Sequence, residues 1–195
     1  MRITKIGIFG GTFDPVHNGH LKTAEFLIEK RKYKKIIFIP NFLSPHKTNS
    51  RITSPFHRLN MLNLALSNKP EFEVSDFELK RNCISYTFET IQHFSEIYKD
   101  LELIIGYDNF LNFNSWKNTN LILNKTKVVI LRRNNNKLIN IKNNPNFIFV
   151  NSPLIDISST EIRNKIKTDQ SIKNLLPTTV INYINKHNLY RDDND

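Results

Sequence analysis

Six short apolar runs, most of them separated by stretches with helical periodicity, constrain the fold of this 195-residue chain more than any other feature. Strands separated by helices are typical of a parallel sheet with right-handed crossovers. The expected strands are Lys5–Gly10, Ile36–Ile39, Phe72–Ser75, Leu101–Ile105, Val128–Leu131 and Phe147–Val150. The expected helices are Leu21–Arg31, Pro55–Ser67, Thr87–Tyr98 and the whole remainder from Ser159 to Tyr190. The predicted fold class is therefore α/β, a doubly wound parallel sheet with a small C-terminal helical subdomain.

The length suits one globular unit with a sizeable core. We expect residues 1–156 to form the strand-and-helix core and residues 157–195 to form a helical segment packed on it. Asn134–Asn146 is polar and low in complexity, and it is expected to be a loop between two strands. No stretch approaches the ~20 apolar residues of a membrane span. The first strand begins almost at once, so no signal peptide is expected.

The net charge of +10 is compatible with nucleic acid or with small anionic nucleotides as partners. The basic residues are scattered among many Asn and Ile residues without a dense Lys/Arg block, so we expect no nucleic-acid partner. Cys83 is the only cysteine, which excludes an intrachain disulfide and a Cys-based metal cluster. A reducing cytoplasm and no membrane partner fit these facts.

The run Gly10–Leu21, Gly-Gly-Thr-Phe-Asp-Pro-Val-His-Asn-Gly-His-Leu, joins the first expected strand to the first expected helix. Glycines let a backbone approach a phosphate closely, and the amino end of a helix offers unpaired N–H groups and a positive dipole end. His17 and His20 add two donors on the same side. The run therefore predicts a site that holds a polyphosphate while one of its phosphorus atoms reacts, although a purely structural turn has the same pattern.

Other polar segments also follow expected strands: Pro40–Lys47, Gly106–Asp108 and the residues from Ser158 onwards. Ligands of doubly wound sheets bind beyond the carboxyl ends of the strands, so these segments are expected at one site. No spacing typical of metal ligands is present, and no arrangement of a covalent nucleophile stands out.

Several side chains have two interpretations. Lys47 fits a phosphate contact or a solvated loop lysine, and Trp116 fits a core position or a stacking partner for a flat ring. Ser158 or Ser159 with Glu161 fits a helix cap, or, together with Arg163 one turn later, a site that binds a polyphosphate. Asp14 is expected to fix the glycine-rich turn, and Asp108 fits a ribose contact or a cap. These alternatives stay open on the residues alone.

Taken in order, these motifs resemble the bacterial nicotinate-nucleotide adenylyltransferase family of the nucleotidyltransferase superfamily, whose His-x-Gly-His element is His17-Asn18-Gly19-His20. The resemblance runs from Ile6 to Arg191. It includes Pro45-His46-Lys47, Glu78–Arg81, Ser85-Tyr86-Thr87, Ile105–Asp108, Ser115-Trp116, Ile157–Arg163 and the tail Leu175–Tyr190. The chain departs from the family where Ser44 replaces a proline and where Arg132-Arg133-Asn134 replaces Arg-Pro-Gly.

The resemblance implies a Rossmann-like nucleotide-binding core and a role for each matching residue. It implies that His17, His20, Lys47 and Arg163 act on the ATP phosphates. The implied ATP-binding residues are Gly10, Gly11, Thr12, Phe13, Gly106, Asp108, Ser159 and Arg163. The implied residues for the nicotinate ring and its carboxylate are Thr87, Trp116 and Lys117, with backbone N–H groups nearby.

The implied reaction transfers the adenylyl group of ATP to nicotinate mononucleotide, with Mg²⁺ accompanying ATP and no metal site on the protein. The alternatives are a sister enzyme acting on nicotinamide mononucleotide or phosphopantetheine, and a non-catalytic nucleotide- or nucleic-acid-binding module. The oligomeric state stays open, a homodimer included.

Overall fold

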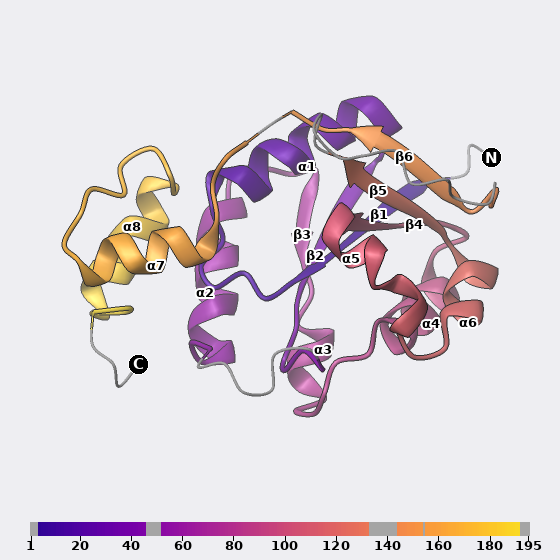
Figure 1. The fold of residues 1–195 in the computed structure, drawn as a ribbon, viewed down its shortest axis with the longest axis horizontal. Coiled ribbons are helices and arrows are strands. Elements are labelled where there is room, and N and C mark those ends of the chain that lie inside the picture. The colour runs from indigo at the N-terminus through magenta and orange to yellow at the C-terminus, as the bar shows by residue number, and fades with distance from the viewer. Residues whose placement is uncertain (1–3, 46–51, 133–143, 154, 192–195) are drawn as a thin grey trace.

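The computed structural model describes residues 4–45, 52–132, 144–153 and 155–191, and it places helices on both faces of one sheet (Figure 1). The strands are β1 (Lys5–Gly11), β2 (Lys35–Pro40), β3 (Phe72–Val74), β4 (Asp100–Gly106), β5 (Lys127–Arg132) and β6 (Phe147–Asn151). The longer helices are α1 (Asn18–Arg31), α2 (Pro55–Leu66), α4 (Thr87–Ile97), α7 (Ser159–Lys167) and α8 (Thr178–Lys186). The shorter ones are α3 (Phe77–Lys80), α5 (Tyr107–Leu111), the 3₁₀ turn η1 (Phe113–Ser115) and α6 (Thr119–Lys125).

The sheet has the strand order β3-β2-β1-β4-β5-β6, and every neighbouring pair is parallel. This arrangement confirms the predicted α/β class and the doubly wound parallel sheet. The strand order reverses between β1 and β4, which makes the carboxyl ends of these two strands the switch point where such sheets bind ligands.

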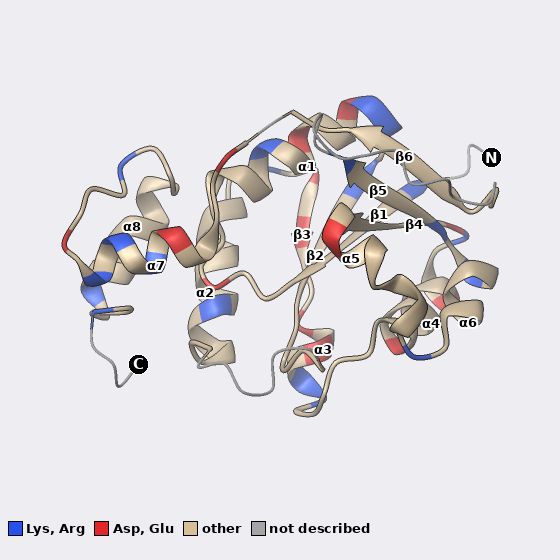
Figure 2. Cartoon of the chain, in the orientation of Figure 1, with Lys and Arg blue, Asp and Glu red and all other residues tan. Residues whose placement is uncertain are grey.

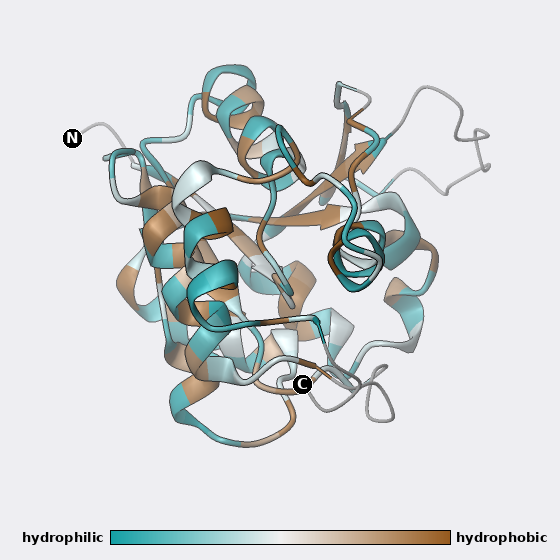
Figure 3. Cartoon of the chain, turned by 90° about the vertical axis from the view of Figure 1, so that its left-hand side faces the viewer, coloured by the Kyte–Doolittle hydropathy of each residue, from teal (hydrophilic) through white to brown (hydrophobic). Residues whose placement is uncertain are grey.

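Alternate residues of each strand enter two separate apolar clusters, because side chains alternate between the faces of a sheet. Phe9, Phe38 and Ile104 pack on the face covered by α1 and α2. Ile8 and Leu103 pack on the opposite face, with α4 and α6. The strands in Figure 3 are accordingly coloured largely as hydrophobic, whereas the surrounding helices mix both colours.

The C-terminal segment differs from its prediction. It is not helical throughout, because turns at 168–177 separate α7 from α8. Asp169 and Asn174 adopt positive φ there, and Pro177 disfavours a helical residue before it. Val180 and Ile184 of α8 are buried in the same apolar cluster as Phe9, so the segment covers α2 beside the sheet (Figure 1).

The sequence prediction missed α3, α5, η1 and α6. Elements of one or two turns carry too few residues to show a helical period, so their apolar side chains resemble loop or strand residues. The prediction also began α1 at Leu21, whereas the helix begins at Asn18. This earlier start places His20 inside the first turn.

A buried carboxylate, that of Glu102, lies near the amino end of β4, away from the switch point. It accepts hydrogen bonds from Arg31 Nε at 2.9 Å and Tyr33 Oη at 2.6 Å, and Lys5 Nζ lies 3.6 Å away. Burial alone raises the pKa of Glu102, but the bonds from Arg31 and Tyr33 outweigh it and hold that pKa below its usual value. This network closes the amino edge of the sheet.

Basic side chains are spread over several helices rather than gathered on one (Figure 2). Across the described parts of the chain, no helix has the length and apolar character needed to cross a membrane. The thiol of Cys83 is exposed.

Candidate active site

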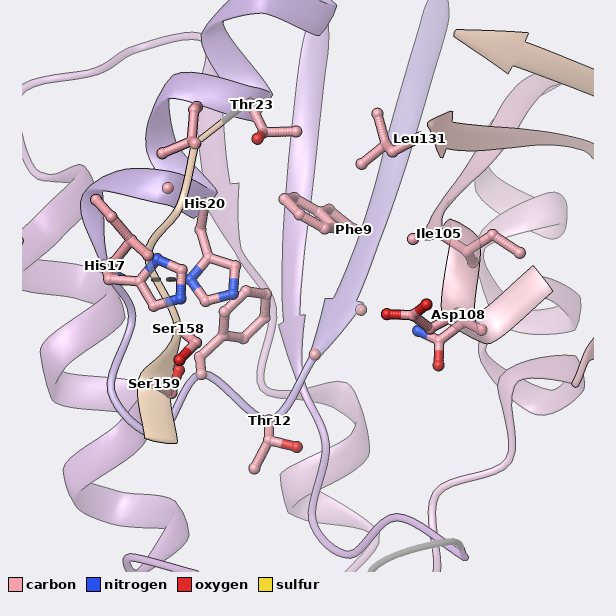
Figure 4. A pocket seen from close by; sticks show the side chains of 18 of the residues that line it. Phe9, Thr12, His17, His20, Thr23, Ile105, Asp108, Leu131, Ser158 and Ser159 are labelled. Atoms are coloured by element: carbon pink, nitrogen blue, oxygen red, sulfur yellow. Dashed lines mark hydrogen bonds between the residues drawn. The ribbon is translucent and has the colours of Figure 1, made fainter. Parts of the chain in front are cut away.

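A cleft of about 1160 Å³ opens at the switch point. The ends of β1 and β4 form its floor, and the amino ends of α1 and α7 form one wall. Figure 4 shows His17, His20, Ser158 and Ser159 on that wall, with Ile105 and Asp108 across from them and Phe9 between. Ten predicted site residues line this cleft: Gly10, Gly11, Thr12, Phe13, His17, His20, Gly106, Asp108, Ser159 and Arg163.

The two histidines form a stacked pair at the start of α1. Their ring centroids are 3.7 Å apart, with an angle of 25° between the planes. The backbone N–H of His17 donates to Nδ1 of His20 at 3.2 Å (Figure 4). Because Nδ1 accepts a hydrogen bond, the neutral ring of His20 carries its proton on Nε2. His20 therefore has an N–H donor available to a ligand.

Both histidines are neutral at pH 7. Burial lowers the pKa of His17 to about 4. Burial also lowers the pKa of His20 well below its usual value, and the nearby charge of a protonated His17 lowers it further. His20 is thus an oriented neutral donor rather than a fixed cation.

Three glycines in the cleft lining matter because they lack a Cβ atom. A Cβ on Gly19 would lie 2.9 Å from Nδ1 of His17, so this glycine lets the His17 ring pack against the backbone. A Cβ on Gly10 or Gly106 would meet no atom within 4 Å. Both residues line the cleft, so that open space is part of it.

Ser159 and Arg163 reach the same loop from α7. Ser159 Oγ donates to the carbonyl of Pro15 at 3.0 Å, and Arg163 Nη1 donates to the carbonyl of Asp14 at 2.8 Å. The Asp14 carboxylate is buried, and it accepts from Tyr190 Oη at 2.8 Å and from the Thr53 N–H at 3.3 Å. Asp14 therefore fixes the turn, as predicted, and joins it to the C-terminal segment.

Thr87, Trp116 and Lys117 do not line the cleft. Lys117 Nζ lies 4.5 Å from the centroid of the Tyr86 ring and 5.7 Å from that of the Phe88 ring, the two residues that flank Thr87 in the sequence. Trp116 is half-buried and packs on Phe113 with centroids 5.3 Å apart, so it is at least partly a core residue. Lys47, the remaining predicted site residue, lies outside the described residues.

The sequence analysis missed cleft residues that carry no recognisable motif. Thr23 lies one turn after His20 on α1, and Leu131, Ser152 and Ile155 line the cleft from β5 and the segment before α7. The spacing of Thr23 from His20, three residues on a helix, was a usable signal. The described parts of the chain hold no group of three His, Cys, Asp or Glu side chains able to bind a metal ion.

Comparison with known proteins identifies relatives along nearly the whole chain. A family model described as cytidylyltransferase-like matches residues 8–165. A probable nicotinate-nucleotide adenylyltransferase of Clostridium novyi is 43% identical, and the alignment covers 96% of this chain and 99% of the relative. A protein of the same name from Clostridium tetani is 41% identical, with the same coverage.

Among solved structures, the nicotinic acid mononucleotide adenylyltransferase of Plasmodium falciparum in complex with NaAD superposes with a TM-score of 0.81. Its sequence identity is 21%, over 98% of this chain and 100% of the other. At this identity the likeness establishes the shared fold alone.

The neutral histidines predict a dependence of stability on pH. An unfolded histidine binds a proton near pH 6.5, whereas folded His17 resists until about pH 4, so the unfolded state binds more protons between these values. The free energy of unfolding should therefore fall as the pH drops from 6.5 to 4, with His17 contributing on the order of 2 kcal/mol. Urea unfolding of His17→Asn should show a smaller fall than the parent. A His93→Asn variant, altered outside the cleft, is the control, and equal acid sensitivity of His17→Asn and the parent would contradict the assignment.

The open space at Gly10 predicts a variant that folds normally and binds ATP poorly. Gly10→Ala adds a methyl group that meets no protein atom, so the free energy of unfolding should change by less than about 1 kcal/mol. Its KM for ATP should rise at least about tenfold. In the control Gly7→Ala, the new Cβ meets Ile104 Cδ1 at 2.9 Å, which should cost about 1–3 kcal/mol of stability without changing that KM. An unchanged KM in Gly10→Ala would place the nucleotide elsewhere.

Proposed function

The chain belongs to the cytidylyltransferase-like family and, within it, to the nicotinate-nucleotide adenylyltransferases, and on this premise we propose that its cleft joins ATP and nicotinate mononucleotide. The products are nicotinate adenine dinucleotide and pyrophosphate, in a step of NAD biosynthesis. The observation that carries the proposal is the stacked pair His17 and His20, whose donors lie at the amino end of α1 inside a cleft at the switch point.

The proposed reaction is a direct displacement. A phosphate oxygen of the mononucleotide attacks the α-phosphorus of ATP, the bond from that phosphorus to the bridging oxygen breaks, and pyrophosphate leaves in line. Such a reaction needs positioning and charge stabilisation more than covalent chemistry. His20 donates through Nε2 to the reacting phosphate, and His17 lies stacked against it. The positive dipole end of α1 adds to this stabilisation.

We assign the remaining cleft residues to ATP. Gly10, Gly11, Thr12 and Phe13 line the nucleotide, and the space beside Gly106 and Asp108 takes the adenosine side. Arg163 and Ser159, which lie where α7 meets the loop, hold the triphosphate. Lys47, which follows β2 in the sequence, is assigned to the phosphates on the resemblance alone.

The mononucleotide is assigned to a surface formed by Thr87, Trp116 and Lys117. The ring of Trp116 offers a flat apolar face, and the Lys117 ammonium lies close by on the Tyr86 ring. A cation and backbone N–H groups suit the negative carboxylate of nicotinate better than a neutral amide. This surface supports the acid form as substrate.

ATP enters as its Mg²⁺ complex in this proposal. The Asp14 carboxylate is occupied by Tyr190 and Thr53, which leaves Asp108 as the other carboxylate of the cleft lining. Mg²⁺ keeps several waters and is readily held through phosphate oxygens, so it would reduce the negative charge of the triphosphate with little direct help from the protein.

We further propose residues 1–156 as the nucleotide-binding core and residues 157–195 as a helical segment packed on it. A cytoplasmic location accords with ATP as substrate and with a single exposed thiol. The oligomeric state, including a homodimer, is left for direct measurement.

The proposed substrate is tested by measuring pyrophosphate release from Mg-ATP with three acceptors. Nicotinate mononucleotide should give a kcat/KM at least about tenfold above nicotinamide mononucleotide, because a site built for a carboxylate leaves its donors unpaired with an amide. Phosphopantetheine should be inactive, since it has no ring for Trp116. Preference for the amide or for phosphopantetheine would support a sister enzyme. Folded protein that binds ATP but reacts with none of the acceptors would support a binding module.

The role of His20 predicts a large effect on turnover. His20→Ala removes the Nε2 donor, and loss of one transition-state donor lowers kcat about a hundredfold or more. Stopped assays at saturating substrates measure this change, with circular dichroism to confirm folding. The control His93→Ala, outside the cleft, should keep the parent's kcat. Unchanged turnover in folded His20→Ala would exclude the assigned role.

A further inference from the structure

Arg58 of α2 is fully buried, and it is the largest fully buried side chain described. Its guanidinium donates to four backbone carbonyls. Nε bonds Thr53 at 2.9 Å, Nη1 bonds both Thr12 and Asn41 at 2.8 Å, and Nη2 bonds Phe42 at 3.3 Å. One side chain thus joins the loop after β1, the loop after β2 and the turn before α2.

A cation in this position needs an explanation beyond stability. Within the described ranges, no carboxylate oxygen lies within ion-pair or hydrogen-bond distance of Arg58. Removing a charge from water is unfavourable, and burial lowers the pKa of this guanidinium, an effect that the more distant charge of Asp14 offsets only in part. Only the planar fork of arginine presents enough donors to reach carbonyls of three separate segments, whereas lysine is a point donor.

On one side, Arg58 holds the phosphate loop. The Thr12 carbonyl that it binds comes directly before Phe13, a residue at φ 50° whose ring lies 5.0 Å from the ring of His20. The N–H of Asn41 also donates to the carbonyl of Gly11 at 3.0 Å. The position of Arg58 therefore fixes the loop beneath the histidine pair.

On the other side, the same guanidinium is connected, through Phe42 and Ser85, to the segment that begins the proposed mononucleotide surface. The N–H of Phe42, whose carbonyl binds Arg58, donates to Ser85 Oγ at 3.0 Å. The N–H of Ser85 returns a bond to the carbonyl of Leu43 at 2.9 Å. Ser85 begins the segment Ser85-Tyr86-Thr87. A continuous set of hydrogen bonds thus runs from Thr12 through Arg58 and Phe42 to Ser85.

We propose that Arg58 is a positioning residue that sets the distance between the two bound nucleotides. It touches neither nucleotide, and it aligns the phosphate loop with the Ser85–Thr87 segment so that the attacking oxygen faces the α-phosphorus. This inference rests on the proposed function, because the two segments serve two substrates of one reaction.

The test compares kcat with KM in Arg58→Lys. A misplacement of about 1 Å costs up to about a hundredfold in rate, so kcat should fall about 10- to 100-fold. Each KM should stay within about threefold, because the contacts of each nucleotide with its own segment remain. A merely structural role would lower the melting temperature and leave kcat, measured well below that temperature, unchanged. That result would overturn the proposal.

Arg31→Lys is the matched control. Arg31 also binds through a guanidinium, but to Glu102 at the amino edge of the sheet, so its replacement should lower stability without lowering kcat. Ser85→Ala offers a second variant that leaves the buried cation intact. It cuts the bond from Phe42 and should lower kcat in the same sense with a small change in KM. If Arg58→Lys does not fold, the kcat of Ser85→Ala tests the proposal, and an unchanged kcat would overturn it.

Hydrogen exchange separates this proposal from the proposed function. In the parent, binding of an ATP analogue with a methylene α,β-bridge should slow exchange of the amides in residues 84–88, which lie outside the ATP cleft. Arg58→Lys should lose this protection while it still binds the analogue. Equal protection in both proteins, or none in the parent, would overturn the role of Arg58. Absence of pyrophosphate release from the parent with nicotinate mononucleotide would instead overturn the proposed reaction.

Discussion

The loops at the carboxyl edge of the sheet contain backbone carbonyls and N–H groups that no strand pairs, and the rest of the structure depends on how these groups are satisfied. Unpaired buried polar groups cost about 1–3 kcal/mol each. Arg58 from α2 covers four carbonyls, and Ser159 and Arg163 from α7 cover two more. The Asp14 carboxylate takes a backbone N–H and the hydroxyl of Tyr190. Side chains from distant parts of the chain thus give the loops one conformation.

The two edges of the sheet differ in their interactions: the amino edge holds a stabilising charge network, and the carboxyl edge holds the cleft. At the amino edge, Glu102 is enclosed by Arg31, Tyr33 and Lys5, and its charge has two cationic partners. At the carboxyl edge, the charged groups bond mainly to backbone carbonyls, and Gly10 and Gly106 leave open space. Removing one partner of a buried pair costs about 3–5 kcal/mol, so the amino edge supplies rigidity. The carboxyl edge keeps donors and space for ligands.

The sequence predicted what local patterns encode. The parallel sheet followed from apolar runs, and ten site residues followed from the motifs Gly10–Leu21, Gly106–Asp108 and Ser159–Arg163, which now line one cleft. Arg58 was not predictable, because an arginine in a helical pattern indicates a solvated face unless the loops packed on it are known. Thr87, Trp116 and Lys117 were predicted from the resemblance, and none of the three lines the cleft. Contacts between loops that are far apart in the sequence, such as those of Arg58, can be found only from the three-dimensional structure.

The use of neutral donors in a site for a polyanion follows from the same geometry. A buried cation beside His20 would bind ATP strongly in the ground state, which lowers KM without raising turnover. A neutral imidazole fixed by the His17 N–H offers an oriented Nε2 donor whose bond strengthens as charge develops on the transferred phosphate. The low pKa values of both histidines are the electrostatic cost of burying them, and they keep the two rings neutral at pH 7. In the proposed reaction, burial therefore shifts stabilisation from the bound substrate towards the transition state.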